Sequence, residues 1–308
     1  MKLNILVTGG TGFIGSHLCE KLVKRNHNLT IITSSGNYDN IKSIINKENV
    51  IIVNANISEY ASLEKSIANN KFDIIFHLAS YIPKGAPDDD LKCIKVNDIG
   101  TKNILEFAKN NQCKKFIYSS TGWVYGNPQH IPVDENHPKN PFDAYGKTKL
   151  NGENYCKKYS KYMNIIILRY AGVYGPRKDK GAVYSFIKNM LEKKTIIIYG
   201  DGTQTNDYIY VNDVINANLL AMEIIEETTF DIFNVGSGQE KSAIELANLI
   251  GDLLKIKPKI KYKDTKITNK RYFLDITKAK KILKFKPSNF KICLEKFITY
   301  IKESEGLI

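Results

Sequence analysis

Short runs of mostly apolar residues recur along the first part of the chain, and each run is about as long as one β-strand. The runs do not alternate between apolar and polar positions, as a strand with one face in water does. Continuous apolar runs of this length are typical of strands that are buried on both faces in a parallel sheet. The runs expected to form strands are residues 3–8, 29–32, 50–53, 72–77, 115–119 and 165–168.

Segments with helical periodicity lie between these runs, and the longest are residues 91–110 and 144–162. Strands that alternate with helices predict parallel strands joined by right-handed crossovers, which is an α/β fold with a doubly wound parallel sheet. Such sheets bind ligands at the carboxyl ends of their strands, so we expect functional residues there. After the first strand, the apolar positions at helical spacing are Phe13, Ile14, Leu18, Leu22 and Val23.

The loop after the first strand contains three glycines, Gly9, Gly12 and Gly15. Gly9 allows a sharp turn, Gly12 lets the backbone approach a phosphate, and Gly15 lets the helix pack close to the strand. The N–H groups at the start of the following helix would then face the anion. A glycine triad between a strand and a helix predicts a dinucleotide site of the Rossmann type, and the alternative is a tight turn in an unrelated α/β protein.

The end of the second predicted strand has no acidic residue, because Thr33, Ser34 and Ser35 follow the apolar run. In NAD sites of this type a carboxylate at this position accepts hydrogen bonds from the ribose, and it would repel a 2′-phosphate. The three hydroxyl groups could instead donate to that phosphate. We therefore expect NAD or NADP as the cofactor, with NADP slightly favoured.

Candidate catalytic residues follow the fifth predicted strand. Tyr145 and Lys149 are four residues apart, so on a helix they share one face. A phenol is a weak base because its pKa is about 10, but a nearby ammonium favours the phenolate. Tyr145 could then remove a proton from a hydroxyl group of a sugar, and Thr121 or Ser120 would stabilise the charge on that oxygen. The alternative for such a pair is a solvated helix face.

The formal net charge of +13 at pH 7 raises nucleic-acid binding as an alternative function. No helix-turn-helix, zinc-finger or RNA-binding motif accompanies the charge, so we expect no nucleic-acid partner. A basic surface would also attract a small substrate that carries phosphate.

No apolar run approaches the ~20 residues that span a membrane, and a strand begins almost at the N-terminus. We therefore expect no signal peptide, no membrane partner and a cytoplasmic location. The five cysteines show no CxxC pair, which is typical of reduced thiols and predicts no metal site. They are Cys19, Cys93, Cys113, Cys156 and Cys293.

Together these motifs resemble the extended short-chain dehydrogenase/reductases, and among them the NAD-dependent epimerase/dehydratase family that acts on nucleotide sugars. Residues 8–15 are similar to its TGGTGFIG loop, 77–80 to its HLAA segment, and 120–126 to its SSxxVYG element. Tyr145 and Lys149 match its YxxSK pair. Further similar segments are 96–97 (VN), 168–176 (LRYFNVYGP), 207–214 (RDFVYVDDV) and 233–238 (FNVGSG). The resemblance covers nearly the whole length.

The resemblance implies roles for individual residues. Asn97 would support the active site and its proton relay, and residues 77–80 would line the cofactor with their backbone. The expected cofactor-binding residues are Gly9, Thr11, Gly12, Phe13, Ile14, Gly15, Thr33, Ser34, Ser35, Asn56, Ile57, Leu78, Ala79, Ser80, Asn97, Tyr145 and Lys149. The expected substrate-binding residues are Trp123, Tyr174, Arg177, Asn206 and Arg271.

The chain departs from the family pattern where the substrate diphosphate is expected to bind. Gly172 replaces an asparagine and Asn206 replaces an arginine, and a guanidinium grips phosphate in a way that an amide does not. Other cations such as Arg177, Lys178, Lys180 and Arg271 could compensate. Asn56 replaces an aspartate at the adenine contact, where its amide oxygen can still accept a hydrogen bond.

Another departure concerns the reaction. The family's 4,6-dehydratases have Asp-Glu after the catalytic threonine, but this chain has Gly122 and Trp123, so dehydration is not expected. The function we expect is an NAD(P)-dependent nucleotide-sugar epimerase that transiently oxidises C4 of the sugar and returns the hydride. The alternatives are an NADPH-dependent reductase of a nucleotide 4-keto sugar and a non-catalytic dinucleotide-binding regulatory protein.

The expected organisation has a cofactor domain and a smaller C-terminal substrate lobe. Residues 1–170 form most of the dinucleotide-binding domain, to which a segment at about 207–235 returns. Residues 171–308 form mainly the substrate lobe, and the cleft between the two holds a nucleotide-diphosphate sugar. The resemblance raises a homodimer as one option, because family members often pair through two helices of each subunit, but the sequence itself does not determine the oligomeric state.

Overall fold

The computed structural model of the chain describes residues 2–67, 70–224, 229–264 and 271–307. None of the helices in these ranges is both long enough and apolar enough to cross a membrane. In the same ranges, no group of three or more His, Cys, Asp or Glu side chains is placed to hold a metal ion. All five cysteines have free thiols and are buried.

The chain divides into two compact units. The first unit comprises Met1–Gly126, Pro138–Tyr170 and Ile215–Phe233, and the second comprises Asn127–His137, Ala171–Val214 and Asn234–Ile308. The segment 207–235, which we expected to return to the cofactor domain, is therefore divided: residues 215–233 belong to the first unit and 207–214 to the second.

The described part of the first unit is built on a seven-stranded sheet in the order β10-β6-β5-β4-β1-β2-β3. The strands from β1 to β6 pair in parallel, and β1 lies inside the sheet between β4 and β2, where Val7 is opposite Ile31 of β2 and Phe76 of β4. This order confirms the predicted doubly wound α/β fold. The bounds are β1 Asn4–Thr8, β2 Asn28–Thr33, β3 Val50–Asn54, β4 Ile74–His77, β5 Lys115–Thr121, β6 Asn164–Tyr170 and β10 Phe230–Val235.

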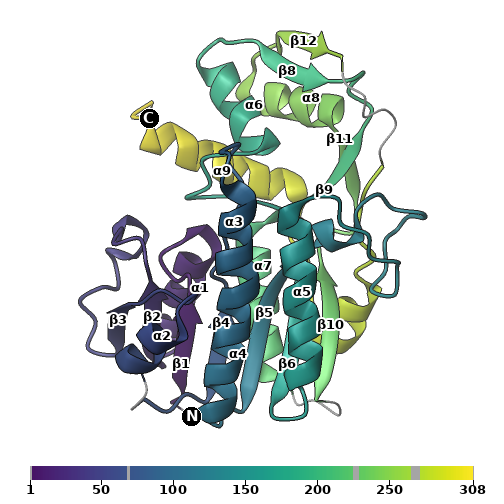
Figure 1. Ribbon diagram of the computed structural model, residues 1–308. Coiled ribbons are helices and arrows are strands. Elements are labelled where there is room, and N and C mark those ends of the chain that lie inside the picture. Colours follow the sequence, from purple (N-terminus) through teal and green to yellow (C-terminus); the bar gives the residue numbers. More distant parts are fainter. Residues whose placement is uncertain (1, 68–69, 225–228, 265–270, 308) are drawn as a thin grey trace. The chain divides into compact units, whose positions relative to one another are not determined.

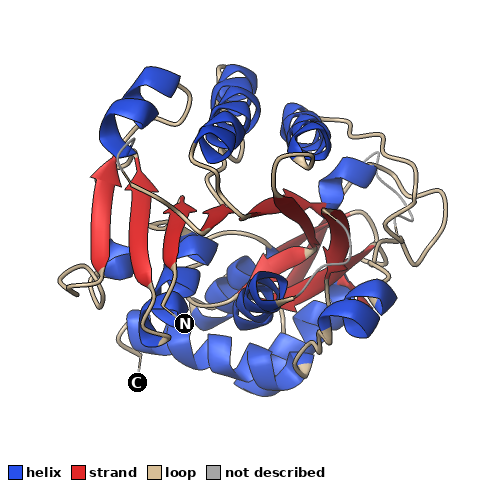
Figure 2. Cartoon of the chain, turned by 90° about the horizontal axis from the view of Figure 1, so that it is seen from below, coloured by secondary structure: helices blue, strands red, loops and turns tan. Residues whose placement is uncertain are grey.

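Helices lie on both faces of this sheet (Figure 2). Figure 1 shows α4 and α5 side by side in front of the strands and α7 behind them. The α-helices are α1 Phe13–Lys24, α2 Tyr60–Ile67, α3 Asp89–Cys93, α4 Gly100–Asn110, α5 Ala144–Tyr159 and α7 Val211–Glu223. The shorter segments are the 3-10 helices η1 Asp39–Ile41 and η3 Gly122–Tyr125 and the π-helix η2 Ile94–Ile99.

Two predicted helices differ from the observed ones in detail. The single helix expected over residues 91–110 is α3, η2 and α4 in succession, so a π-helical turn interrupts it. The helix expected over 144–162 ends at Tyr159, because the chain has to reverse its direction before β6 begins at Asn164.

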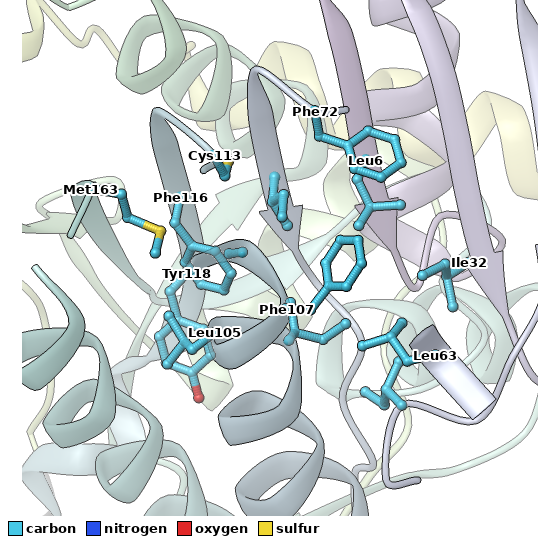
Figure 3. Close-up of a cluster of buried hydrophobic side chains, with 14 of the residues drawn as sticks. Leu6, Ile32, Leu63, Phe72, Leu105, Phe107, Cys113, Phe116, Tyr118 and Met163 are labelled. Carbon is cyan, nitrogen blue, oxygen red and sulfur yellow. The ribbon is translucent and has the colours of Figure 1, made fainter. Parts of the chain in front are cut away.

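Apolar side chains from the strands and from α2, α4 and α5 form the core on one face of the sheet (Figure 3). Leu6 of β1 and Phe116 of β5 meet Leu105 and Phe107 of α4, and all four side chains are buried. Because the sheet carries helices on both faces, its strands need apolar side chains on both. This explains why they appear in the sequence as continuous apolar runs.

The second unit contains two small sheets and several helices. β9 Thr205–Tyr210 lies between β7 Gly172–Tyr174 and β11 Glu240–Ser242, and β8 Ile196–Tyr199 pairs in parallel with β12 Ile260–Lys263. A capping box of Ser242 and Glu245 begins α8. The helical segments are α6 Ala182–Leu191, α8 Ala243–Leu254, the π-helix η4 Ala279–Leu283 and α9 Phe290–Ser304.

A buried carboxylate holds several loops of the second unit together. Asp207 of β9 is fully buried and accepts hydrogen bonds from the backbone N–H groups of Ser237, Gly238 and Leu274 at 2.8, 3.3 and 3.2 Å. The Ser237 hydroxyl donates to the same carboxylate at 2.6 Å. Burial raises the pKa of Asp207 and these hydrogen bonds oppose that effect. Asp207 therefore connects two of the segments that carry the family resemblance, 207–214 and 233–238.

His77, at the end of β4, is a buried neutral side chain in the first unit. Its Nδ1 lies 2.6 Å from the Thr8 hydroxyl and its Nε2 lies 2.9 Å from the Thr101 hydroxyl. Thr101 donates its own proton to the Asn97 carbonyl oxygen, so it accepts from Nε2–H, and Nδ1 accepts from Thr8. Burial, with a smaller contribution from the charge of Lys149, lowers the pKa of His77 to about 3.

The buried imidazole should make the protein less stable in acid. Because the pKa of His77 is about 3 in the folded chain and 6.5 for an unperturbed imidazole, the unfolded chain binds the extra proton between these values. Its contribution to stability falls as the pH drops through this window, by about 2 kcal/mol at pH 5. Urea unfolding at pH 7 and pH 5 should show a larger loss for the wild type than for His77→Gln, and equal losses would contradict this assignment.

Candidate active site

The glycine loop between β1 and α1 fits a pyrophosphate group. Gly9 has a φ of 70°, and a Cβ atom there would lie 2.7 Å from the Ala79 nitrogen. A Cβ on Gly15 would collide with the Gly9 carbonyl oxygen. The N-cap residue of α1 is Gly12, and its first turn contains no acidic residue. The turn therefore offers backbone N–H groups to an anion and places no negative side chain against it.

The hydroxyl groups at the end of β2 separate into one buried and two exposed groups. Thr33 is buried, and its Oγ1 lies 3.0 Å from the Thr11 hydroxyl and 3.2 Å from the Ser35 hydroxyl. It therefore ties the glycine loop to β2. Ser34 and Ser35 are exposed to solvent.

Asn56, the predicted adenine contact, forms hydrogen bonds within its own turn. Its Oδ1 accepts hydrogen bonds from the backbone N–H of Ser58 at 3.1 Å and from the Ser58 hydroxyl at 2.7 Å, and its amide group donates to Glu59. Both lone pairs of the amide oxygen are used in this turn. The predicted acceptor for an adenine amino group is therefore engaged before any ligand arrives. Ile57, the next residue, is buried.

The segment after β4 lies against the glycine loop through its backbone. The N–H of Leu78 donates to the Thr8 carbonyl oxygen at 3.2 Å, and the N–H of Ala79 donates to the Thr8 hydroxyl at 3.2 Å. These hydrogen bonds to Thr8 also bring Ala79 close to Gly9, the next residue of the loop. This arrangement places the backbone of Leu78 and Ala79 beside the loop that is expected to bind the cofactor.

Tyr145 lies in the first turn of α5, which begins where the Asp143 side chain accepts from the Gly146 N–H at 2.7 Å. Burial raises the pKa of the Tyr145 phenol to about 12, and a hydrogen bond donated by Thr121 opposes this increase. The Ser80 side chain is also within hydrogen-bond reach of the phenol. The structure thus brings the predicted pair of Tyr145 and Thr121 together. It also places Ser80 there, which we had expected only to line the cofactor.

The neighbours of these two hydroxyl groups determine which way each can donate. Thr121 Oγ1 accepts from the Trp123 N–H at 3.3 Å, so its proton can point to the Tyr145 oxygen. Ser80 donates to Asn97 Oδ1 at 3.1 Å, so its oxygen can accept from the phenol. The Tyr145 oxygen therefore lies between one group that can donate to it and one that can accept from it.

Asn97 is a fully buried side chain in the π-helix η2. Its Oδ1 accepts from the Tyr81 N–H at 2.7 Å, and its Nδ2 donates to the Tyr81 carbonyl oxygen at 2.9 Å. Nδ2 also lies 3.4 Å from the hydroxyl of Thr148, which is on α5. Asn97 thus holds the segment after β4 in place and fixes the direction of the Ser80 hydrogen bond.

Ser120 does not take the role that we predicted for it beside Thr121. Its hydroxyl donates to Glu153 Oε1 at 2.6 Å. Successive side chains of a strand alternate between its faces, so consecutive residues of β5 do not both point at Tyr145. Thr121 is the hydroxyl group that reaches the phenol, and Ser120 belongs to a separate buried network.

That buried network is centred on an ion pair that sequence reasoning missed. Arg169 of β6 donates to both oxygens of Glu153, from Nε at 2.9 Å and from Nη2 at 2.7 Å. Arg169 Nη1 donates to the Tyr125 hydroxyl at 2.8 Å, and both charged side chains are buried. The sequence spacing could have revealed Glu153, because it lies four residues after Lys149 and so on the same face of α5.

Lys149 is buried between α5 and the sheet. Its Nζ lies 4.3 Å from the centroid of the Tyr118 ring, which is a cation–π distance. Burial lowers the pKa of Lys149 to about 7, and the negative charge of Glu153 partly opposes this effect. The ammonium group is therefore held in a position where loss of its proton near neutral pH is easy.

Trp123 is the one predicted substrate-binding residue in the first unit, and its ring centroid lies 6.4 Å from that of Tyr145. The other four lie in the second unit. Tyr174 is buried and contacts the rings of Tyr210, Phe290 and Phe297. These packing contacts are enough to explain why its side chain is buried.

The three other predicted substrate-binding residues of the second unit are polar: Arg177, Asn206 and Arg271. Arg271 is exposed and forms an ion pair with Glu240. Asn206 is an exposed residue of β9, where it pairs with Lys241 of β11, and Arg177 has a φ of 70°. Their role in binding a diphosphate stays a prediction.

Comparisons with known proteins agree with this geometry. Residues 5–236 match the NAD dependent epimerase/dehydratase family. A putative UDP-glucose 4-epimerase of Methanocaldococcus jannaschii is 36% identical, over 97% of this chain and 99% of the relative. A UDP-N-acetyl-alpha-D-glucosaminuronate decarboxylase of Bacillus cytotoxicus is 34% identical, over 99% of this chain and 100% of the relative.

Among solved structures, the UDP-glucuronic acid 4-epimerase of Bacillus cereus in complex with NAD is 31% identical to this chain. It matches the fold with a TM-score of 0.88, over 98% of this chain and 99% of that one. Fold, glycine loop, tyrosine–lysine helix and sequence similarity agree over nearly the whole length, and the chain belongs to the NAD-dependent epimerase/dehydratase family.

Proposed function

We propose that this protein is an NAD(P)-dependent nucleotide-sugar 4-epimerase. The observation that carries the proposal is that the Tyr145 hydroxyl is in hydrogen-bond reach of both Thr121 and Ser80. Lys149 follows on the same face of the helix, and the glycine loop belongs to the same compact unit. Two of the three similar proteins described above are named as 4-epimerases of UDP sugars.

In this proposal Tyr145 is the base that takes the proton of the C4 hydroxyl group. A dinucleotide held by the glycine loop would supply the hydride acceptor for C4 and the source of the hydride that returns to the opposite face of the sugar. Thr121 donates to the Tyr145 oxygen and stabilises its negative charge, and the Lys149 ammonium favours the same ionised form. After the hydride has returned, Tyr145 gives the proton back to O4, so protons and electrons balance over the cycle.

The proposal assigns the nucleotide diphosphate to the second unit as the substrate lobe. Arg177, Asn206 and Arg271 are the residues assigned to it. Arg271 is paired with Glu240, so its guanidinium group would have to leave or share that carboxylate to bind phosphate.

One alternative is a reductase of a nucleotide 4-keto sugar. It is favoured by the hydroxyl groups at the end of β2, where NAD sites of this type carry a carboxylate. The two reactions differ in cofactor use, because an epimerase regenerates its cofactor in each cycle and a reductase consumes one NADPH per product.

The test uses the purified protein with UDP-glucose, UDP-N-acetylglucosamine and UDP-glucuronic acid in turn, without added cofactor. We expect at least one of them to be converted to its 4-epimer over many turnovers, measured by NMR of the product, without net change in the absorbance of reduced nicotinamide. The epimerase proposal fails if added NAD(P) also produces no interconversion while a nucleotide 4-keto sugar drives stoichiometric oxidation of NADPH.

The first prediction from this mechanism concerns the base. Tyr145→Phe should lower turnover by at least ~100-fold, a typical contribution of a general base, while the dinucleotide still binds. Tyr159→Phe is a matched control, because it removes a hydroxyl from the same helix that bonds to Glu106 and not to the site. Steady-state kinetics and calorimetry measure both effects, and near-normal turnover of folded Tyr145→Phe would eliminate the mechanism.

A second prediction concerns the cofactor. The wild type should bind NADP(H) at least as well as NAD(H), because no carboxylate stands at the end of β2. Thr33→Asp should shift the preference toward NAD(H), since a carboxylate repels the 2′-phosphate, and the uncharged Thr33→Asn should not. Calorimetry of the three proteins with both cofactors measures the shift, and a wild type that clearly prefers NAD(H) contradicts the argument.

A further inference from the structure

Two large aromatic side chains are exposed beside Tyr145. Trp123 is 53% exposed and Phe142 is 55% exposed, and their ring centroids are 5.6 Å apart with an angle of 46° between the ring planes. Trp123 also meets the Tyr145 ring edge to face, at 6.4 Å. Single exposed aromatic residues are common, but a pair of them next to a catalytic hydroxyl is a candidate binding surface.

The backbone of this pair is held by the same contacts that hold the catalytic residues. The Trp123 N–H donates to the Thr121 hydroxyl, and the Trp123 carbonyl oxygen accepts from the Gly126 N–H at 3.2 Å. Phe142 directly precedes Asp143, the N-cap of α5. The aromatic pair therefore has a defined position relative to Tyr145 before any ligand binds.

Glycine allows the two segments to approach each other closely. A Cβ atom on Gly146 would lie 3.0 Å from the Trp123 carbonyl oxygen and 2.8 Å from the Cβ of Pro141. A Cβ on Gly126 would collide with the Asn140 carbonyl oxygen. This close packing brings the rings of Trp123 and Phe142 together from two separate stretches of chain.

We propose that Trp123 and Phe142 form a stacking surface for the sugar ring of the nucleotide sugar. This proposal rests on the proposed function, because it takes the reacting sugar to be the group that meets Tyr145. A pyranose presents polarised C–H groups on its faces, which match the negative face of an aromatic ring. With its C4 hydroxyl in hydrogen-bond reach of Tyr145, the sugar would extend over the neighbouring Trp123.

An aromatic surface suits the proposed reaction for a second reason. Hydride that leaves from one face of C4 and returns to the other requires the sugar to present both of its faces in turn. Hydrogen bonds are directional and would favour one orientation of the ring, whereas hydrophobic contact is non-directional. A surface of two tilted rings can hold the sugar in either orientation.

The test is a binding measurement that does not depend on turnover. Calorimetry in the presence of NAD gives the Kd of UDP and the Kd of whichever UDP sugar, of UDP-glucose, UDP-N-acetylglucosamine and UDP-glucuronic acid, binds the wild type most tightly. Trp123→Ala and Phe142→Ala should each raise the Kd of the UDP sugar by about five- to tenfold, which corresponds to the loss of one aromatic contact. The Kd of UDP alone should change by less than about twofold.

Two further variants make the result specific. Trp123→Phe keeps an aromatic face and should retain most of the affinity for the UDP sugar. Tyr162→Ala removes an aromatic side chain that is 51% exposed on another part of the first unit, and it should leave both Kd values unchanged. An unchanged Kd of NAD in every variant shows that the fold is retained.

The outcomes separate this inference from the proposed function. If the Kd of the UDP sugar does not change in the alanine variants, or if the Kd of UDP rises equally, the stacking surface is wrong. If none of the three UDP sugars binds the wild type more tightly than UDP does, the stacking surface is also wrong. If the sugar contribution is lost as expected but no variant or wild type interconverts C4 epimers, the surface stands and the epimerase proposal fails.

Discussion

The buried ion pair between Glu153 and Arg169 is the interaction on which the geometry of the candidate site depends. It joins α5, which carries Tyr145 and Lys149, to β6 in the sheet, and both oxygens of the carboxylate are used. Ser120 connects the same carboxylate to β5, the strand that ends at Thr121. Removing one partner of such a pair leaves a buried charge and typically costs about 3–5 kcal/mol. The ion pair therefore stabilises the position of α5, which carries Tyr145, relative to β5, which carries Thr121.

Close packing contributes to the same register. A Cβ on Gly152 would collide with the Tyr118 hydroxyl, so glycine lets α5 lie directly on that ring. The Lys149 ammonium group lies against the same ring, at 4.3 Å from its centroid. Tyr118 in turn stacks on His77 with ring centroids 5.7 Å apart. Tyr118 therefore contacts α5, the Lys149 ammonium group and the buried His77 at the same time.

Burial favours the neutral form of both titratable groups of the site. It raises the pKa of Tyr145 to about 12 and lowers the pKa of Lys149 to about 7, so it favours the neutral form of each. The interactions that favour the charged forms are local: the Thr121 hydrogen bond for the phenolate and the charge of Glu153 for the ammonium. This balance gives a site whose proton affinity is sensitive to a few neighbours, which is the property that acid–base chemistry near neutral pH requires.

The sequence by itself determined the features that depend on local spacing. Continuous apolar runs and helical periodicity predict the parallel sheet, and three glycines between a strand and a helix predict the dinucleotide loop. The spacing of Tyr145 and Lys149 places them on one helix face, because helical geometry is periodic along the chain. Similarity to a family of known fold adds the expected catalytic roles, but the roles of individual site residues remain predictions.

Only the tertiary structure decided which side chains from distant segments meet. It placed Thr121 rather than Ser120 beside Tyr145 and engaged the amide of Asn56 in a turn. It also brought Ser80 to the phenol, and Phe142 to Trp123. Most of these contacts join residues that are far apart in sequence. The choice between Ser120 and Thr121 depends on which face of β5 each side chain points to. The physical cause of these contacts is the packing of helices on a sheet, and local patterns along the chain carry no information about it.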